Sequence, residues 1–135
     1  MTLVVDASVV VPWLFDLGNS ERSEAALRSD RLIAPDLIMA EIDNAGWKLV
    51  QFNGFDRHVV RDAVAHVGQF VEEIVSGVDL RDRALEIALD LGHPVYDCFY
   101  LALAESRRCR LATLDVRLAR RCAGTSYSDL LNPVG

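Results

Sequence analysis

The chain has 135 residues, of which 51% are apolar and 25% are charged, and its formal net charge is −6 at pH 7. This length fits one compact domain over residues 1–135, and the composition excludes an intrinsically disordered chain. The negative net charge also argues against the broad basic surface of many nucleic-acid-binding proteins.

The first residues carry no targeting or membrane-spanning pattern. A secretory signal needs a basic segment before an uninterrupted apolar run, whereas Asp6 interrupts this run and no basic residue precedes it. The apolar stretch from Ala7 to Phe15 contains Ser8 and Pro12 and is too short to cross a bilayer. We therefore expect a cytoplasmic protein with no membrane contact.

Short apolar runs alternate with segments in which apolar residues recur at the helical period. Pro35 is well placed as the first residue of a helix that Asn53-Gly54 ends, and Gly92 suits the position after another helix. Asp56 and Asp79 are placed to cap helices. The predicted strands are 3–5, 32–34, 74–75, 110–113 and 125–127. The predicted helices are 7–14, 21–28, 35–52, one from 56 with an apolar face to 71, 79–91, one from 94, and 116–122.

This alternation predicts an α/β fold with a parallel sheet of about four or five short strands and helices on both faces. In such sheets the ligand site lies beyond the carboxyl ends of the strands, near the point where the strand order reverses. Asp6 and Asp115 both come at the carboxyl end of a predicted strand. They are therefore candidate site residues.

Two further acidic residues lie on predicted helices, at positions that border the core. Asp97 lies near the start of the apolar run VYDCFYLALAE, which contains no basic residue. Glu41, in PDLIMAEIDNAGWK, borders the buried side of its helix, and Asn44 neighbours it on the same surface. A carboxylate removed from water is costly unless a positive group meets it. These two acids therefore join Asp6 and Asp115 as candidates.

Each acid taken singly has a structural explanation that is favoured over a functional one. Asp6 and Asp115 are placed to cap the helices that follow them. Asp97 is favoured by the dipole of its helix, and Glu41 is able to pair with an arginine. The case for a site therefore depends on the four acids being brought together.

Four carboxylates at one sheet edge would repel one another strongly unless protons or cations lay between them. Oxygen ligands without histidine or cysteine suit Mg²⁺ or Mn²⁺ rather than zinc. An ion held in this way activates a bound water and polarises a phosphoryl oxygen. Since the chain has no GxxxxGK[ST], GxGxxG or GxSxG motif, phosphodiester hydrolysis is the predicted reaction.

Four segments, in this order and at these intervals, resemble the PIN-domain family: VVDASVVVPWL, PDLIMAEIDNAGWK, PVYDCFYLALAE and LATLDVRLAR. The resemblance covers essentially the whole chain and is greatest to the VapC toxins of bacterial and archaeal type II toxin–antitoxin modules. It implies a three-layer α/β/α sandwich with a central parallel sheet. It also implies an endoribonuclease site that depends on Mg²⁺ or Mn²⁺.

The resemblance assigns roles to individual residues. Ser8, in the D-x-S position, and Thr113, in the T-x-D motif, would support the acids by hydrogen bonds. Asn44, which neighbours Glu41 on its helix, is a further candidate for a supporting residue. Residues 116–118 offer no further acid or asparagine, which leaves both a one-metal and a two-metal site open. The family's catalytic and metal-binding acids fall on Asp6, Glu41, Asp97 and Asp115.

The resemblance further implies an RNA substrate, a homodimer and inhibition by a cognate antitoxin whose tail lies beside the acids. Six arginines and a single acid lie between positions 107 and 121, and a solvated helix face explains any one of them equally well. The candidates for contacting the RNA backbone are Arg107, Arg108, Arg110 and Arg117.

Two alternatives to this reading stay open. The first is a PIN-domain nuclease without an antitoxin, which acts on DNA or in RNA processing. The second is a non-catalytic, Mg²⁺-binding regulatory module of the receiver type. That module needs paired acids after its first strand and a late lysine, whereas Asp6 stands alone and Lys48 is the last lysine.

Overall fold

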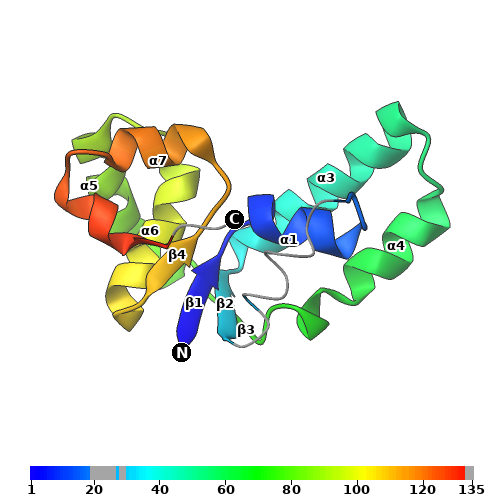
Figure 1. The fold of residues 1–135 in the computed structure, drawn as a ribbon, viewed down its shortest axis with the longest axis horizontal. Helices are drawn as coiled ribbons and strands as arrows, with labels where there is room; N and C mark the ends of the chain where they lie inside the picture. Colours follow the sequence, from blue (N-terminus) through cyan, green and yellow to red (C-terminus); the bar gives the residue numbers. More distant parts are fainter. Residues whose placement is uncertain (19–26, 28–29, 133–135) are drawn as a thin grey trace.

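A parallel five-stranded sheet organises the residues that the computed structural model describes, which are 1–18, 27 and 30–132 (Figure 1). The strands lie in the order β3-β2-β1-β4-β5, and every neighbouring pair is parallel. Their bounds are β1 Thr2–Val5, β2 Arg31–Pro35, β3 Glu73–Val75, β4 Arg110–Ala112 and β5 Leu131–Asn132.

Helices cover both faces of this sheet, and the predicted three-layer α/β/α sandwich is thereby confirmed. Figure 1 shows α1 (Ala7–Leu14), α3 (Leu37–Asn53) and α4 (Arg57–Ala65) on one side of the sheet. The other side carries α5 (Arg81–Leu91), α6 (Val95–Arg107) and α7 (Val116–Cys122). The helix predicted at 21–28 falls largely outside the described residues.

The strand order reverses at β1, the central strand. From β1 the chain steps outwards to β2 and β3, and it then returns through α5 and α6 to place β4 on the other side of β1. Val4 pairs with Ile33 of β2 on one side and with Leu111 of β4 on the other. The carboxyl ends of β1 and β4 therefore meet at the switch point, where a ligand site is expected.

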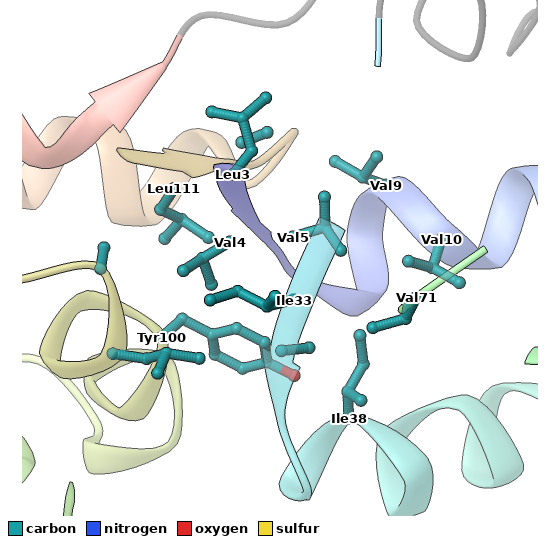
Figure 2. Close-up of a cluster of buried hydrophobic side chains, with 14 of the residues drawn as sticks. Leu3, Val4, Val5, Val9, Val10, Ile33, Ile38, Val71, Tyr100 and Leu111 are labelled. Atoms are coloured by element: carbon teal, nitrogen blue, oxygen red, sulfur yellow. The ribbon is translucent and has the colours of Figure 1, made fainter. Parts of the chain in front are cut away.

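The core is built from the sheet and the inner faces of α1, α3 and α6. Val4, Ile33 and Leu111 are fully buried. In Figure 2, Tyr100 of α6 lies on one side of the strands and Val10 of α1 on the other. The apolar run of α6 is thus explained by burial, and no described helix is both long and apolar enough to cross a membrane.

Pro35 was predicted to begin a helix, and this prediction is wrong, because Pro35 is the last residue of β2 and pairs with Val75. The missing N–H of proline is not needed there, since the next residue, Asp36, donates its backbone N–H to the Val75 carbonyl at 2.8 Å. Helix α3 then begins at Leu37 and ends before Gly54, as predicted, with Gly54 in the left-handed conformation.

Two predicted helix boundaries near the middle of the chain also need correction. Asp56 caps α4 as predicted, by accepting from the backbone of His58 and Val59, but α4 ends at Ala65 and a 3₁₀ turn follows. The predicted cap Asp79 lies inside a 3₁₀ turn that leads directly into α5. Because the chain is already helical there, no side chain is needed to cap α5.

The predicted strand at 125–127 is instead the start of a 3₁₀ helix, Ser126–Leu130, and β5 follows it. The Thr125 side chain accepts from the backbone N–H of Tyr127, and the Tyr127 hydroxyl donates to Asp90. The local bond of Thr125 and the long-range bond of Tyr127 together outweigh the strand propensity of these two residues.

Gly46 allows α3 to lie close to α4 and to the end of α1. A Cβ added at Gly46 would lie 2.7 Å from Cγ1 of Val60 and 3.3 Å from Cζ of Phe15. Alanine is better than glycine in a helix by about 1 kcal/mol, but overpacking costs about 1–3 kcal/mol, and the branched valine has little freedom to move.

We therefore expect Gly46→Ala to lower the free energy of unfolding by about 1 kcal/mol in urea denaturation. The matched control is Gly68→Ala, since a Cβ at Gly68 meets no atom within 4 Å. Equal stability of these two variants would show that the close contact at Gly46 is not constraining.

Candidate active site

Asp6, directly after β1, is a buried acid, and the residue is 6% exposed. It occupies the N-cap position of α1 without making a side-chain capping bond. Instead, the Ser8 hydroxyl donates to its Oδ1 at 2.5 Å, and the Thr113 hydroxyl donates to its Oδ2. The carboxylate is therefore fixed between β1 and the segment that follows β4.

Backbone N–H groups orient the two hydroxyls that hold Asp6. Ser8 Oγ accepts from the backbone N–H of Leu114 at 2.9 Å, and Thr113 Oγ1 accepts from that of Asp115 at 3.0 Å. Each hydroxyl thus has its proton available for the Asp6 carboxylate. This network ties the ends of the two central strands together.

Glu41 projects from α3 and is partly buried. The Tyr100 hydroxyl of α6 donates to Glu41 Oε1, and Tyr100 is only 1% exposed. Its burial and the charge of Glu41 raise the pKa of Tyr100, so the phenol keeps its proton and remains a donor. The partner of Glu41 is therefore a tyrosine and not the arginine considered above.

Asp97, in the first turn of α6, meets His93 one turn earlier in the chain. His93 Nε2 lies 2.6 Å from Asp97 Oδ2, and the two side chains are 8% and 27% exposed. Because a carboxylate only accepts, Nε2 must carry the proton of this bond. His93 is thus the polar partner that the apolar run around Asp97 does not supply.

Asp6, Glu41 and Asp97 lie near enough for their charges to act on one another. Burial, followed by the nearby charge of Asp97, raises the pKa of Asp6 to about 6. Burial and then the charges of Asp97 and Asp6 raise the pKa of Glu41. Three acids that are distant in sequence are therefore gathered at the carboxyl end of β1.

Asp115 combines a structural contact with a place beside Asp97. Its Oδ1 accepts from the backbone N–H groups of Arg117 and Leu118, so it caps α7. It also faces a cleft of about 570 Å³ that Asp97 shares. The capping explanation is thus correct for Asp115 and does not remove it from the site. Other residues that line this cleft are His93, Arg117, Arg120 and Arg121.

The donors at this edge suit a hard divalent cation. They are carboxylate oxygens with a single imidazole, and their mutual repulsion would be relieved by a cation between them. Within residues 1–18, 27 and 30–132, no three Asp, Glu, His or Cys side chains are grouped as closely as the ligands of one ion. Each of Asp6, Glu41 and Asp97 is instead turned to its own hydrogen-bond donor.

The structure does not bring every predicted residue to the acids. Asn44 is exposed on α3 and makes no hydrogen bond to an acid in the part of the chain that is described. Arg107 binds Glu73 of β3 at 2.7 Å, and Arg108 and Arg110 line a second cleft with Met1 at the amino ends of the strands. These three arginines therefore lie at the opposite edge of the sheet from the acids.

The residues that hold Glu41 and Asp97, namely Tyr100 and His93, are not among those predicted from the sequence. His93 lies four residues before Asp97, a spacing that suits neighbours on one helical surface but is common in any sequence. The contact of Tyr100 with Glu41 spans 59 positions, and no local pattern indicates it.

Comparison with known proteins identifies the family of this chain. The family model of the PIN domain matches residues 3–124. Ribonuclease VapC3 of Pyrobaculum aerophilum is 31% identical over 124 residues, which cover 90% of this chain and 95% of the relative. Ribonuclease VapC9 of Mycobacterium tuberculosis is 32% identical over 117 residues, which cover 87% and 88%.

Solved structures share the fold. PAE2754 from Pyrobaculum aerophilum has a TM-score of 0.69 and 26% identity, covering 93% of this chain and 82% of that one. VapBC2 from Rickettsia felis, solved bound to a DNA fragment from the promoter, has a TM-score of 0.71 at 12% identity and covers both chains fully. The parallel sheet, the matched segment and these relatives together show that the chain belongs to the PIN domain family, with VapC ribonucleases among its relatives.

Proposed function

We propose that this protein is a metal-dependent endoribonuclease that acts as the toxin of a type II toxin–antitoxin pair. The observation that carries the proposal is the placement of acids at the switch point of the sheet: Thr113 ties Asp6 to the end of β4, where Asp115 shares a cleft with Asp97. The names of the relatives, VapC ribonucleases, support RNA as the substrate. Hydrolysis of a phosphodiester in this way leaves a 5′-phosphate and a 3′-hydroxyl.

The residues that would hold Mg²⁺ or Mn²⁺ are Asp6, Asp97 and Asp115, with Glu41 as a further ligand or as a proton acceptor. When bound, such an ion lowers the pKa of a water and offsets the negative charge of the phosphate. The ion also fits the charge of the protein, because it supplies the cation that an acidic site with net charge −6 needs beside a phosphate.

The protein's own contribution is to hold each carboxylate in place. Ser8 and Thr113 fix both oxygens of Asp6. Tyr100 holds Oε1 of Glu41, and the Glu41 carboxylate would thereby be oriented to accept a proton from an attacking water. His93 orients Asp97 in the same manner. Side chains already fixed by packing lose little freedom when substrate binds.

An antitoxin partner, a homodimer and a cytoplasmic location belong to the same proposal. Two further solved structures share the fold. One is a toxin–antitoxin complex from Klebsiella pneumoniae, with a TM-score of 0.65, and the other is VapBC-1 from nontypeable Haemophilus influenzae, with a TM-score of 0.62. An inhibitor that covers the acids would account for how a cell tolerates such a nuclease. Dimer formation rests on the family resemblance.

We expect Asp6→Asn and Asp97→Asn each to lower RNA cleavage by about a hundredfold or more, because each removes a ligand charge from the acid cluster. The measurement uses purified protein and total RNA with MgCl₂, MnCl₂ or EDTA, and maps the new 5′ ends. Asp43→Asn is the matched control, since Asp43 is exposed on α3. Cleavage that persists in EDTA or in both variants, with the folds intact by circular dichroism, would contradict the proposal.

Asp6→Asn should also stabilise the fold at neutral pH. The folded-state pKa of Asp6 is about 6 against an ordinary value of 3.8, so folding binds a proton and the free energy of unfolding falls as the pH rises between these values. A shift of this size corresponds to a loss of up to about 3 kcal/mol above pH 6.

Denaturation of the wild type and of Asp6→Asn in EDTA, from about pH 4 to about pH 7, tests this expectation. The wild type should lose stability over this range, and the variant should lose less and be the more stable protein at neutral pH. A variant that is less stable than the wild type at neutral pH would show that the Asp6 carboxylate stabilises the fold.

A further inference from the structure

Three arginines of α7 share a cleft with two of the acids. Arg117, Arg120 and Arg121 have the spacing i, i+3 and i+4, which places them on neighbouring positions of one helical surface. All three are exposed, and all three line the cleft of about 570 Å³ that also holds Asp97 and Asp115. The cationic and acidic side chains are therefore parts of one continuous surface.

These arginines differ from those that stabilise the fold. Arg31 and Arg107 bind Glu73, and Arg83 binds Glu86 and Glu105. Within the described ranges, none of the three α7 arginines lies within ion-pair distance of a carboxylate. Exposed guanidinium groups without a carboxylate partner are available to bind an anion.

We propose that Arg117, Arg120 and Arg121 form the site that binds the backbone phosphates of the RNA next to the phosphodiester that is cleaved. This inference rests on the proposed function and deepens it, because it says on which side of the acids the substrate extends. A polymer whose scissile phosphate lies at Asp97 and Asp115 has its neighbouring phosphates along the same cleft. Guanidinium groups suit phosphate because their donors form paired hydrogen bonds with its oxygens.

The composition of the cleft favours nucleic acid over an acidic peptide. Asp97 and Asp115 lie in the cleft with the arginines, and they would repel the carboxylates of a peptide. They would also repel a phosphate, but this is where the proposed cation would lie. With that cation bound, the cleft would offer positive charge both at the acids and at the arginines. A chain of phosphates needs positive charge at successive positions.

The arginines at the other end of β4 provide a competing location. Arg108 and Arg110 line a separate cleft at the amino ends of the strands, together with Met1 and Asn132. Asp115 is not among the residues that line it. RNA bound there would not reach the acids through the same cleft. If RNA binds at α7, only the α7 variants should weaken its binding, and if it binds at this edge, only the Arg108 and Arg110 variant should do so.

The test measures how tightly a fluorescein-labelled single-stranded oligoribonucleotide binds, by fluorescence anisotropy in EDTA, from about 50 to about 200 mM KCl. We expect Arg120→Ala/Arg121→Ala to weaken binding about tenfold at the lowest salt concentration. The slope of log Kd against log salt should fall by about 1.4, since each phosphate contact with a single strand contributes about 0.7.

Two double variants remove the same number of charges elsewhere. Arg57→Ala/Arg61→Ala changes exposed arginines of α4, and Arg108→Ala/Arg110→Ala changes those of the competing edge. Both should leave the Kd and the salt slope close to the wild-type values. Thermal melting of each variant shows whether it is folded.

The proposal is overturned if the α7 variant binds RNA like the wild type, or if the Arg108 and Arg110 variant weakens binding equally. It is also overturned if the α7 variant loses affinity only for a labelled polyglutamate peptide, which would make this surface a protein-docking site. Cleavage assays with Mg²⁺ separate the two proposals. If the wild type binds RNA through the α7 arginines but does not cleave it, the proposed nuclease function is contradicted. If the α7 variant cleaves RNA with an unchanged KM, the proposed arginine site is contradicted.

Discussion

The buried carboxylate of Asp6 is the constraint on which the rest of the site depends. It lies at the end of the central strand, and both of its oxygens accept hydroxyl protons from Ser8 and Thr113. Those hydroxyls are in turn held by backbone N–H groups after β4. The register of β1 with β4, with Val5 opposite Ala112, is what allows one side chain to connect the two strand ends.

This arrangement carries a thermodynamic penalty that a bound cation would relieve. Burial and the charges of neighbouring acids raise the pKa values of Asp6 and Glu41, so the ionised cluster destabilises the folded state at neutral pH. A bound cation would recover this free energy. Neutral donors, namely two hydroxyls and a phenol, hold Asp6 and Glu41 without neutralising them. Arginine partners would neutralise the acids and compete with a metal ion.

Much of the fold could be predicted from the sequence because apolar residues recur at clear helical and strand periods. The strands at β1, β2 and β4 and the helices that follow them were predicted, and so was the placement of Asp6 and Asp115 at the carboxyl ends of strands. The errors fall where local geometry overrides propensity. Pro35 is able to end a strand because the N–H that bonds to the Val75 carbonyl belongs to the next residue, Asp36. Thr125 begins a 3₁₀ helix because its hydroxyl accepts from the backbone N–H of Tyr127.

The site was less predictable than the fold because its partners come from separate elements. Tyr100 reaches Glu41 across 59 positions, which no local pattern reveals. The arginines between 107 and 121 form one basic stretch in the sequence. In the structure, strand β4 separates those before it from those of α7. The short strand thus carries Arg110 and Asp115 to opposite edges, and only the α7 arginines share a cleft with the acids.

The most direct test of the account is whether the acids hold one divalent cation in common. Titration of the purified protein with Mn²⁺, followed by the electron paramagnetic resonance of the free ion, reports binding without RNA or turnover. We expect the wild type and Asp43→Asn to bind Mn²⁺ with equal affinity, and Asp6→Asn and Asp97→Asn each to bind it about tenfold or more weakly. Failure of the wild type to bind Mn²⁺, or wild-type affinity in Asp6→Asn or Asp97→Asn, would contradict a shared metal site.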